Sequence, residues 1–482
     1  MELYKKTAKE LSEMLKNGET TSVEITESIY SKIESVEDSV GAYLEINKEK
    51  ALNDAKKADE MIKNGKAGQL TGVPIAIKDN ICVDGFKATC ASKMLGNFEP
   101  PYNATVIEKL KSEGAVIIGK TNMDEFAMGS STENSAFKIT HNPFDLDRVP
   151  GGSSGGSAAA VSCGTVPISL GSDTGGSIRQ PASYCGIVGL KPTYGSVSRF
   201  GLVAFASSLD QIGPFSRTVE DTANLYEIIS GKDERDATSL SSNFSAANVK
   251  SNVKGMKIGI PSEYFGEGVD CKVKELVMNA AKEYEKNGAE LVSISLPFTD
   301  YALSAYYIIA CAEASSNLGR YDGVKYGFRA EGCKTLEEMF VRSRSEGFGN
   351  EVKRRIMLGT FVLSSGYYDA YYKKAKLFQK NLAVEFNNAF SECDFLLTPT
   401  APDVAFRIGE MEDPVKMYAS DICTVTVNLA GLPAVSIPTA GFKDNMPVGM
   451  QLIGKPFSEE TLLTAANFYE KLIGGFKTPG IF

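Results

Sequence analysis

The chain has 482 residues, of which 43% are hydrophobic and 23% charged, as is ordinary for a globular protein with a substantial core. Its formal net charge of -9 disfavours direct contact with a nucleic-acid backbone, which requires a basic face, unless a local basic patch exists within the acidic total. The N-terminus lacks the apolar stretch of a signal peptide, no run is long and apolar enough for a bilayer span, and the nine cysteines form no CxxC pair, so we expect a cytoplasmic protein with reduced thiols.

The predicted elements alternate between helices and strands along the chain. Residues 21–24 have capping-box spacing and open a helix with Ile25, Ile29 and Ile33 on one face, within a helical segment of about 1–70. Short apolar runs bounded by Gly or polar residues predict strands that are covered on both faces. The elements expected after residue 50 are a helix at 51–64, strands at 73–77, 115–118 and 166–170, a surface loop at about 231–255, a strand at 257–260, a helix at 272–286, strands at 290–296, 395–398 and 448–453, and a helix at 459–473. This alternation predicts an α/β fold, and we expect one sheet in a single domain over 1–482.

A glycine- and serine-rich segment, 151–157, precedes the third predicted strand. Such tracts are usually flexible linkers. Here residues 149–172 contain no charged residue and run into an apolar strand, which favours a buried segment in which backbone closely approaches another group. After that strand, residues 171–177 can form a turn whose N–H groups converge on one point, as acyl transfer requires for its oxyanion. Ser177 is therefore a candidate nucleophile; the alternative is a serine that caps the following helix.

A nucleophilic serine needs a base, and the chain contains one histidine, His141. A Ser-His-Asp triad would have to use it, but residues 140–143 resemble a turn, where a histidine is more often a surface or packing residue. A lysine can serve instead if burial lowers its pKa from about 10.4 to about 7–8, at a cost of roughly 4 kcal/mol. Lys78 directly follows the predicted strand 73–77 and is the candidate. The alternative is a solvated lysine paired with Asp79.

Residues 114–121 match the phosphate-binding pattern GxxxxGK[ST]. In a true phosphate loop the residues between the glycines are a flexible cradle that joins a strand to a helix. Here those residues are themselves an apolar strand, and residues 105–113 before them have a helical pattern. We interpret the match as a false positive; a nucleotide-binding switch or scaffold that uses this segment is the alternative from another class of protein.

Two stretches carry a resemblance to the amidase signature family: GGSSGGSAAAV…LGSDTGGSIRQPA…GLKPTYG, from Gly151 to Gly195, and GVPIAIKDN, from Gly72 to Asn80. The resemblance implies a mixed, twisted β-sheet sandwiched between layers of α-helices. It also implies a catalytic triad in which Lys78 is the base, Ser153 is a relay serine with a cis peptide bond, and Ser177 is the acylated nucleophile. The oxyanion hole would be formed by backbone amides in the run from Thr174 through Gly175 and Gly176 to Ser177.

Within this family, residues 313–327, 351–372 and 417–438 resemble the glutaminase subunits of tRNA-dependent amidotransferases. The resemblance implies hydrolysis of glutamine to glutamate and ammonia, with the ammonia used to convert Glu-tRNA(Gln) to Gln-tRNA(Gln). It implies a heterotrimer with the B and C subunits of the amidotransferase, ATP and Mg²⁺ used by the partner subunit, and no cofactor or metal in this chain. The implied glutamine-binding residues are Tyr306, Arg355, Asp421, Gly129 and Ser130, with Arg354 as the adjacent alternative to the arginine. A stand-alone amidase that acts on other small amides is the alternative function.

Overall fold

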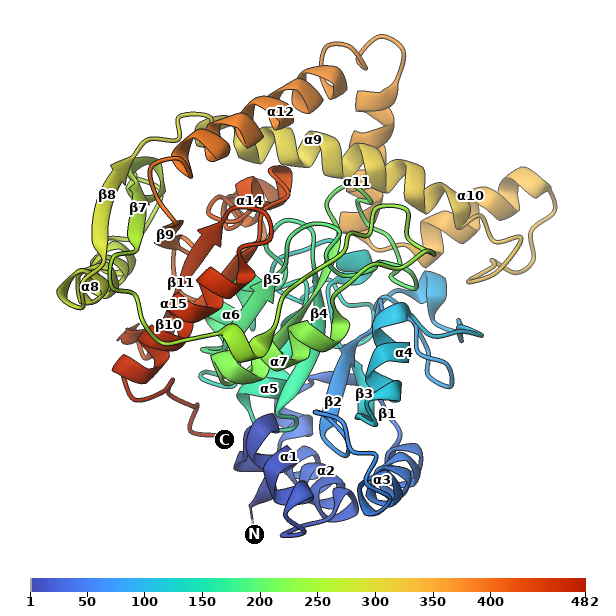
Figure 1. The fold of residues 1–482 in the computed structure, drawn as a ribbon. Helices are drawn as coiled ribbons and strands as arrows, with labels where there is room; N and C mark the ends of the chain where they lie inside the picture. The colour runs from blue at the N-terminus through green and yellow to red at the C-terminus, as the bar shows by residue number, and fades with distance from the viewer. Residues whose placement is uncertain (1) are drawn as a thin grey trace.

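All strands of the described residues, 2–482, belong to one mixed sheet in the computed structural model (Figure 1). Across the sheet the strands run in the order β1 (Tyr43–Ile46), β3 (Val116–Thr121), β2 (Pro74–Lys78), β4 (Ile168–Asp173), β6 (Gln211–Ser216), β5 (Val188–Lys191), β10 (Ala434–Lys443), β11 (Met446–Gly454), β9 (Phe395–Pro399), β7 (Lys257–Pro261) and β8 (Glu290–Ile294). Strands from both sides of the irregular stretch 231–255 lie in it, so the prediction of one sheet is confirmed. The assignment of the chain to a single domain stays a prediction.

Parallel pairing near one side of the sheet brings two polar strand ends together. β2 pairs in parallel with both β3 and β4, and every residue of β2 and β4 is buried. Because the carboxyl ends of parallel strands meet at the same edge of a sheet, Lys78 at the end of β2 and Asp173 at the end of β4 lie at one edge. From β4 the sheet continues through antiparallel pairs, by way of β6 and β5, to β10 and β11.

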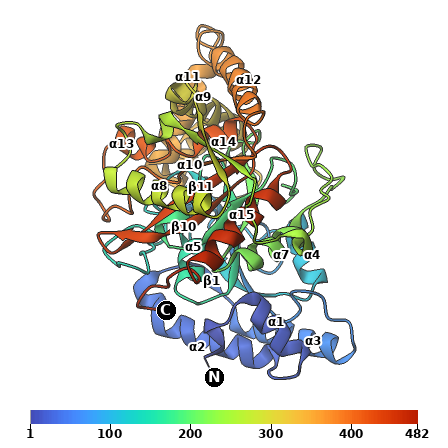
Figure 2. The same cartoon turned by 60° about the vertical axis from the view of Figure 1, so that its left-hand side comes forward.

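Helices cover both faces of the sheet, as Figures 1 and 2 show together. Their bounds are α1 (Ala8–Lys16), α2 (Ser22–Val40), α3 (Lys48–Lys63), α4 (Thr105–Ser112), α5 (Gly155–Ser162), α6 (Arg179–Tyr184), α7 (Val219–Ile229), α8 (Cys271–Lys286), α9 (Thr299–Asn317), α10 (Leu336–Gly347), α11 (Asn350–Leu363), α12 (Tyr372–Ala389), α13 (Pro414–Ala419), α14 (Val425–Leu429) and α15 (Glu459–Leu472). Helix α5 packs against β2 and β4, and α6 against β10 and β11. Among residues 2–482, no helix combines the length and apolarity needed to cross a membrane.

The predicted capping box opens α2. The Thr21 hydroxyl accepts a hydrogen bond from the Glu24 amide, and the Glu24 carboxylate accepts one from the Thr21 amide. Each of these two backbone N–H groups at the start of the helix therefore has a side-chain acceptor. The helix ends at Gly41, which has a left-handed conformation (φ 65°) that terminates helices readily. Ile25, Ile29 and Ile33 are all buried on the face toward the sheet.

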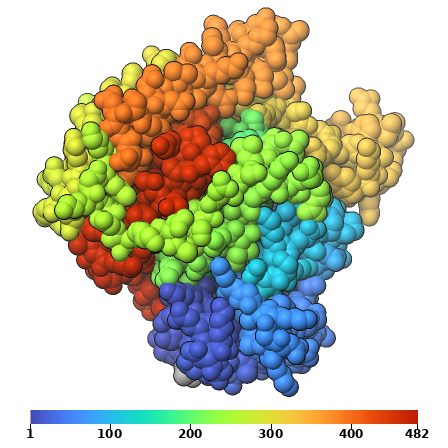
Figure 3. Space-filling model, viewed as in Figure 1, coloured from blue at the N-terminus to red at the C-terminus, as the bar shows by residue number. Residues whose placement is uncertain are grey.

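Helices α9, α11 and α12 pack together at the top of the view in Figure 1, and we call them the helical projection; its orange part stands out at the top of the space-filling view in Figure 3. α11 and α12 both pack against α9. Their outer surfaces carry large apolar side chains that remain exposed, among them Tyr301, Met357, Phe361, Leu377 and Val384. Met357 is 73% exposed and Tyr301 69%, so these apolar side chains are largely open to solvent.

Every strand predicted from an apolar run is present, with bounds that shift by up to three residues. Four strands lacked a prediction: β1, β5, β6 and β10. β1 and β5 have four residues each, and Pro214 in β6 and Pro438 in β10 interrupt the pattern of a strand. The interpretation of residues 114–121 as a false match to the phosphate-binding pattern is confirmed, because most of the segment forms strand β3 rather than a loop. The buried ammonium of Lys120 contacts Asp79 and two backbone carbonyls.

Candidate active site

Lys78 ends β2 in a fully buried cluster of serines. Its Nζ lies 2.7 Å from the hydroxyls of both Ser153 and Ser154, 3.0 Å from the hydroxyl of Ser172 and 3.3 Å from the Ser172 carbonyl. The alternative of a solvated lysine paired with Asp79 is wrong, because Lys78 is 0% exposed and Asp79 pairs with Lys120 instead. The sequence reasoning did not single out Ser154, although its place directly after the candidate relay serine was a signal.

Burial lowers the pKa of Lys78 from its ordinary 10.5 to about 7. The carboxylates of Asp124, Asp173 and Asp210 pull the pKa upward, and desolvation outweighs them. None of the four polar groups around Nζ carries a charge, so no counter-ion in direct contact holds the ammonium form. Near neutral pH a substantial fraction of this amine is therefore unprotonated and able to accept a proton.

The two candidate reacting serines lie on adjacent segments. The Gly152–Ser153 peptide bond is cis, as the resemblance implies, and the Ser153 carbonyl accepts from the Asp124 amide at 3.2 Å. The Ser154 amide donates to the Ser177 carbonyl at 3.3 Å, which joins the two segments directly. Ser153 is 0% exposed while Ser177 is 8% exposed, so Ser177 is the member of the pair that a molecule from outside can reach.

Two alternative interpretations of these segments are wrong. Residues 151–157 are all buried, so they are not a flexible linker. Ser177 is not the capping residue of α6, because Ile178 occupies that position and no side chain caps the helix.

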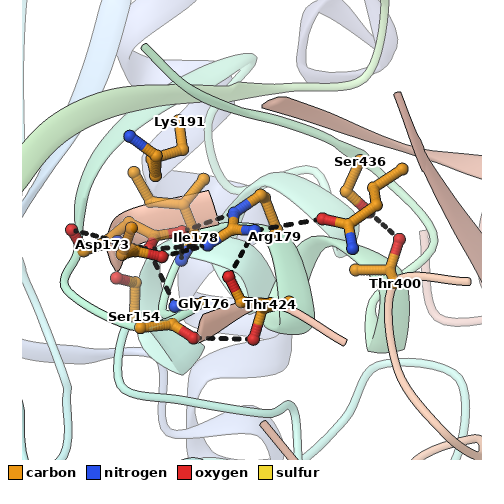
Figure 4. Close-up of polar contacts among 12 residues, drawn as sticks. Ser154, Asp173, Gly176, Ile178, Arg179, Lys191, Thr400, Thr424 and Ser436 are labelled. Atoms are coloured by element: carbon orange, nitrogen blue, oxygen red, sulfur yellow. Dashed lines mark hydrogen bonds and ion pairs between the residues drawn. The ribbon is translucent and has the colours of Figure 1, made fainter. Parts of the chain in front are cut away.

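The turn after β4 is fixed by a buried ion pair that the sequence reasoning missed (Figure 4). Asp173 accepts from Arg179 Nε at 3.1 Å, from the Gly176 amide at 2.8 Å and from the Ile178 amide at 3.1 Å. Burial alone would raise the pKa of Asp173, but the Arg179 guanidinium and the other donors bring it down to about 2, so it remains a carboxylate. A signal existed: these are the first two charges after the uncharged run 149–172.

The Asp173 contact bears on the predicted oxyanion hole. The Gly176 amide already donates to the Asp173 carboxylate, so it is not free to bind an oxyanion. Within residues 2–482 the amides of Thr174, Gly175 and Ser177 have no hydrogen-bond acceptor. Of the predicted run from Thr174 to Ser177, these three amides are the ones that the turn leaves without an acceptor, and the oxyanion hole itself stays a prediction.

Tyr306, on α9, lies directly against this turn. A Cβ added at Gly175 would overlap the end of the Tyr306 ring, which explains why the turn has a glycine there. Tyr306 is 3% exposed, and its hydroxyl has no hydrogen-bond partner among the described residues. The predicted substrate residue is therefore adjacent to the turn that precedes Ser177.

The structure separates the two candidate arginines on α11. Arg355 is 3% exposed; its Nε donates to Glu351 at 2.7 Å, and its guanidinium stacks over the rings of Tyr307 and Tyr418. Arg354 is 44% exposed and pairs with the outer oxygen of Glu351. Only Arg355 faces the interior, so the geometry favours it as the cation of the site.

Asp421 brings a carboxylate to the same region from the segment before α14. Its oxygens accept from the Ser130 hydroxyl at 2.8 and 3.1 Å and from the Tyr307 hydroxyl at 2.9 Å. Burial raises the pKa of Asp421 to about 6, although these hydrogen bonds and the charge of Arg355 oppose the rise.

Gly129, beside Ser130, has a φ of +159° and lies too close to the Asp124 carboxylate for a side chain. The predicted residues Ser130 and Asp421 are thus in direct contact, and Tyr307 is an addition that the sequence reasoning missed.

His141 lies in the expected turn. Its Nδ1 is 2.6 Å from the Leu146 carbonyl, and no hydrogen bond joins its side chain to a serine anywhere in residues 2–482. The geometry therefore gives no support to a Ser-His-Asp triad.

Comparisons with known proteins identify the family of the chain. The Amidase family model matches residues 24–463. The A subunit of glutamyl-tRNA(Gln) amidotransferase from Persephonella marina is 60% identical over 476 residues, and that from Sulfurihydrogenibium sp. is 59% identical over 477 residues; each match covers 98% of both chains. The crystal structure of the same A subunit from Thermotoga maritima has a TM-score of 0.84 at 44% identity, and covers 100% of this chain and 98% of that chain. The peptide amidase from Stenotrophomonas maltophilia has a TM-score of 0.83 at 27% identity, with 99% of each chain covered. The residues of the site, the sheet that carries them and these similarities together show that the chain belongs to the amidase family.

Proposed function

We propose that the chain is the glutaminase subunit of a tRNA-dependent amidotransferase. The observation that carries the proposal is a buried amine with a pKa of about 7, placed 2.7 Å from the hydroxyl of Ser153. The backbone amide of the next residue, Ser154, donates to the backbone carbonyl of Ser177, which holds the two serine segments side by side. The relatives at 59–60% identity are named as the A subunit of glutamyl-tRNA(Gln) amidotransferase, which supports this particular amidase activity.

The first half-reaction acylates Ser177. Its oxygen attacks the carbonyl carbon of the glutamine side-chain amide while its proton passes through the Ser153 hydroxyl to the neutral Lys78 amine. Negative charge develops on the amide oxygen, where the amides of Thr174, Gly175 and Ser177 would stabilise it. The C–N bond then breaks as Lys78 returns the proton through Ser153 to the leaving nitrogen. Ammonia departs, and a γ-glutamyl ester remains on Ser177.

The second half-reaction uses water in the same way. Water attacks the ester carbon, its proton moves through Ser153 to Lys78, and breaking of the ester bond returns that proton to Ser177. Glutamate leaves and the resting enzyme is restored. No histidine takes part, and each proton accepted by Lys78 is given back within the same half-reaction.

Glutamine would be oriented by opposite charges on two sides of the site. The guanidinium of Arg355 is available to its α-carboxylate, and the carboxylate of Asp421 to its α-ammonium. The Tyr306 hydroxyl, which has no partner in the described residues, would complete the set with Ser130 and Gly129. An ordinary aliphatic amide has neither charge, so this pair distinguishes a glutaminase from a stand-alone amidase.

The ammonia would pass to the partner B and C subunits, where ATP and Mg²⁺ would be used to convert Glu-tRNA(Gln) to Gln-tRNA(Gln). The exposed apolar side chains of the helical projection support binding of a protein partner. The free state of all nine cysteines supports a cytoplasmic location, where thiols are kept reduced.

The experiment that tests the proposal is mass spectrometry of the chain after reaction with a glutamine-mimicking diazoketone, which alkylates the nucleophile. The adduct is expected on Ser177. Ser177→Ala is expected to abolish glutaminase activity, while the matched control His141→Ala leaves it nearly intact. An adduct elsewhere, or a folded His141→Ala variant without activity, would overturn the assignment. Hydrolysis of simple aliphatic amides without preference for glutamine would instead support the stand-alone amidase.

A further inference from the structure

The peptide unit between Gly175 and Gly176 is held at both of its polar ends. Its carbonyl accepts from the Thr424 hydroxyl at 2.6 Å, and its N–H donates to the Asp173 carboxylate at 2.8 Å. Both partners are fully buried. The two contacts together favour this orientation of the peptide plane, and the Gly175 carbonyl keeps its partner only while the Thr424 hydroxyl stays in place.

The surrounding atoms restrict this peptide on two sides. A Cβ at Gly176 would overlap the Thr424 hydroxyl, and Gly176 has a φ of +137°. On the other side the Tyr306 ring lies against Gly175. The plane of the Gly175–Gly176 peptide constrains the directions of the two amides that flank it, those of Gly175 and Ser177, which are two of the three amides available to an oxyanion.

Thr424 also belongs to the segment that carries Asp421. The Thr424 amide donates to the Asp421 carbonyl at 2.9 Å, and the same carbonyl lies 3.0 Å from the Thr424 hydroxyl as a second acceptor. The Thr424 carbonyl accepts from Arg179 Nη1 at 3.1 Å, and Arg179 pairs with Asp173 (Figure 4). A closed set of contacts therefore joins Asp421 to the turn before the nucleophile through one residue.

We propose that Thr424 is a positioning residue that couples occupation of the ammonium site at Asp421 to the orientation of the oxyanion-binding turn. An ammonium bound to the Asp421 carboxylate holds the Asp421 segment in the position that keeps the Thr424 hydroxyl on the Gly175 carbonyl, and so keeps the Gly175 and Ser177 amides aimed at the oxyanion. The inference rests on the proposed function, since it takes glutamine as the substrate. Its consequence is that the α-ammonium of glutamine contributes to the rate of the chemical step as well as to binding.

The test compares two substrates in the full-length chain: glutamine, and glutaramate, which is glutamine without the α-amino group. In the wild type, glutaramate is expected to have a kcat about 10- to 100-fold below that of glutamine, somewhat less than the loss of a whole oxyanion donor. Thr424→Val keeps the shape and removes the hydroxyl. It is expected to lower kcat for glutamine by about the same factor, with KM nearly unchanged, and to leave glutaramate almost unaffected, so that the two kcat values converge.

Matched variants separate coupling from simple damage to the fold. Thr424→Ser keeps the hydroxyl and is expected to retain most of the difference between the substrates. Thr426→Val is the control on the same segment, because the Thr426 hydroxyl contacts Tyr264 rather than the turn; it should leave both substrates unchanged. If Thr424→Val does not fold, Thr424→Ala provides the same loss of a hydroxyl without a new buried methyl group.

The outcomes also distinguish this inference from the proposed function. A wild-type chain that hydrolyses glutamine while Thr424→Val lowers kcat for both substrates equally, or for neither, overturns the coupling and leaves the glutaminase assignment intact. A wild-type chain that does not discriminate between glutamine and glutaramate in KM or kcat overturns the proposed function itself.

Discussion

Replacing Lys78 by methionine removes a fully buried amine, and its effect on stability is calculable. The pKa of Lys78 falls from 10.5 in an unfolded chain to about 7 in the folded protein. Because the folded value is the lower one, the folded state resists protonation. Burying the charged amine lowers the unfolding free energy of the wild type by its full amount below about pH 7, and this cost disappears as the pH rises toward 10.5. Lys78→Met has no such penalty at any pH.

The difference in unfolding free energy between the two proteins should therefore change with pH. From the two pKa values, the unfolding free energy of the wild type should rise by about 3 kcal/mol relative to that of Lys78→Met when the pH is raised from 7.5 to 10. Hydrogen bonds lost by the variant at Ser153, Ser154 and Ser172 shift the difference by a constant, so they do not alter this slope. All other titrating groups, including the buried Lys191, are present in both proteins and cancel.

The assay is urea denaturation of both proteins at several pH values, followed by circular dichroism and analysed as the difference in midpoint at equal m. The companion measurement is kcat/KM for glutamine, which should rise with pH through about 7 in the wild type and be lost in Lys78→Met. A stability difference that stays constant from pH 7.5 to 10 would mean that Lys78 is a solvated cation in the folded chain. The reasoning about the base would then be refuted.

Three further predictions concern recognition of the substrate. Arg355→Met is expected to raise KM for glutamine about 100-fold through loss of a charged hydrogen bond in a buried site, whereas Arg354→Met changes it less than about twofold; equal effects in steady-state kinetics would contradict the assignment. Because the pKa of Asp421 is about 6, KM for glutamine should rise as the pH falls through 6 and the carboxylate is protonated, and the Asp421→Asn variant should have a high KM with no such pH dependence. Gly175→Ala is expected to lower kcat by at least about 100-fold, because the new methyl group overlaps Tyr306; unchanged kinetics would show that the turn tolerates displacement.

The sequence was sufficient for the parts of the site that depend on local pattern. Lys78 follows an apolar run, and an apolar run that ends in a lysine predicts a buried strand end, which is what β2 provides. Ser153 lies in a stretch without charge, and that absence predicted burial correctly. In both cases the pattern that predicts burial, an apolar run or a stretch without charge, lies within about ten residues of the buried residue.

The rest of the site depends on contacts between distant segments. Asp173 meets Arg179 because of the turn after β4, but its link to Thr424 depends on the order of strands from β4 to β11, two of which are interrupted by proline and were not predicted. The choice between Arg354 and Arg355 depends on the rotation of α11, since adjacent helical residues point about 100° apart. One of them is 44% exposed and the other 3%, a difference that composition does not reveal.

The wide spacing of these segments has a consequence during translation. A ribosome completes Lys78, Ser153 and Ser177 long before it reaches Asp421 and Thr424, more than 240 residues later, which takes on the order of tens of seconds. Until that last part of the chain emerges, the nascent chain holds the proposed base and nucleophile without the segment that secures the turn and would receive an amino acid. We therefore expect an incomplete or prematurely terminated chain to lack glutaminase activity, so that activity would arise only once the protein is nearly complete.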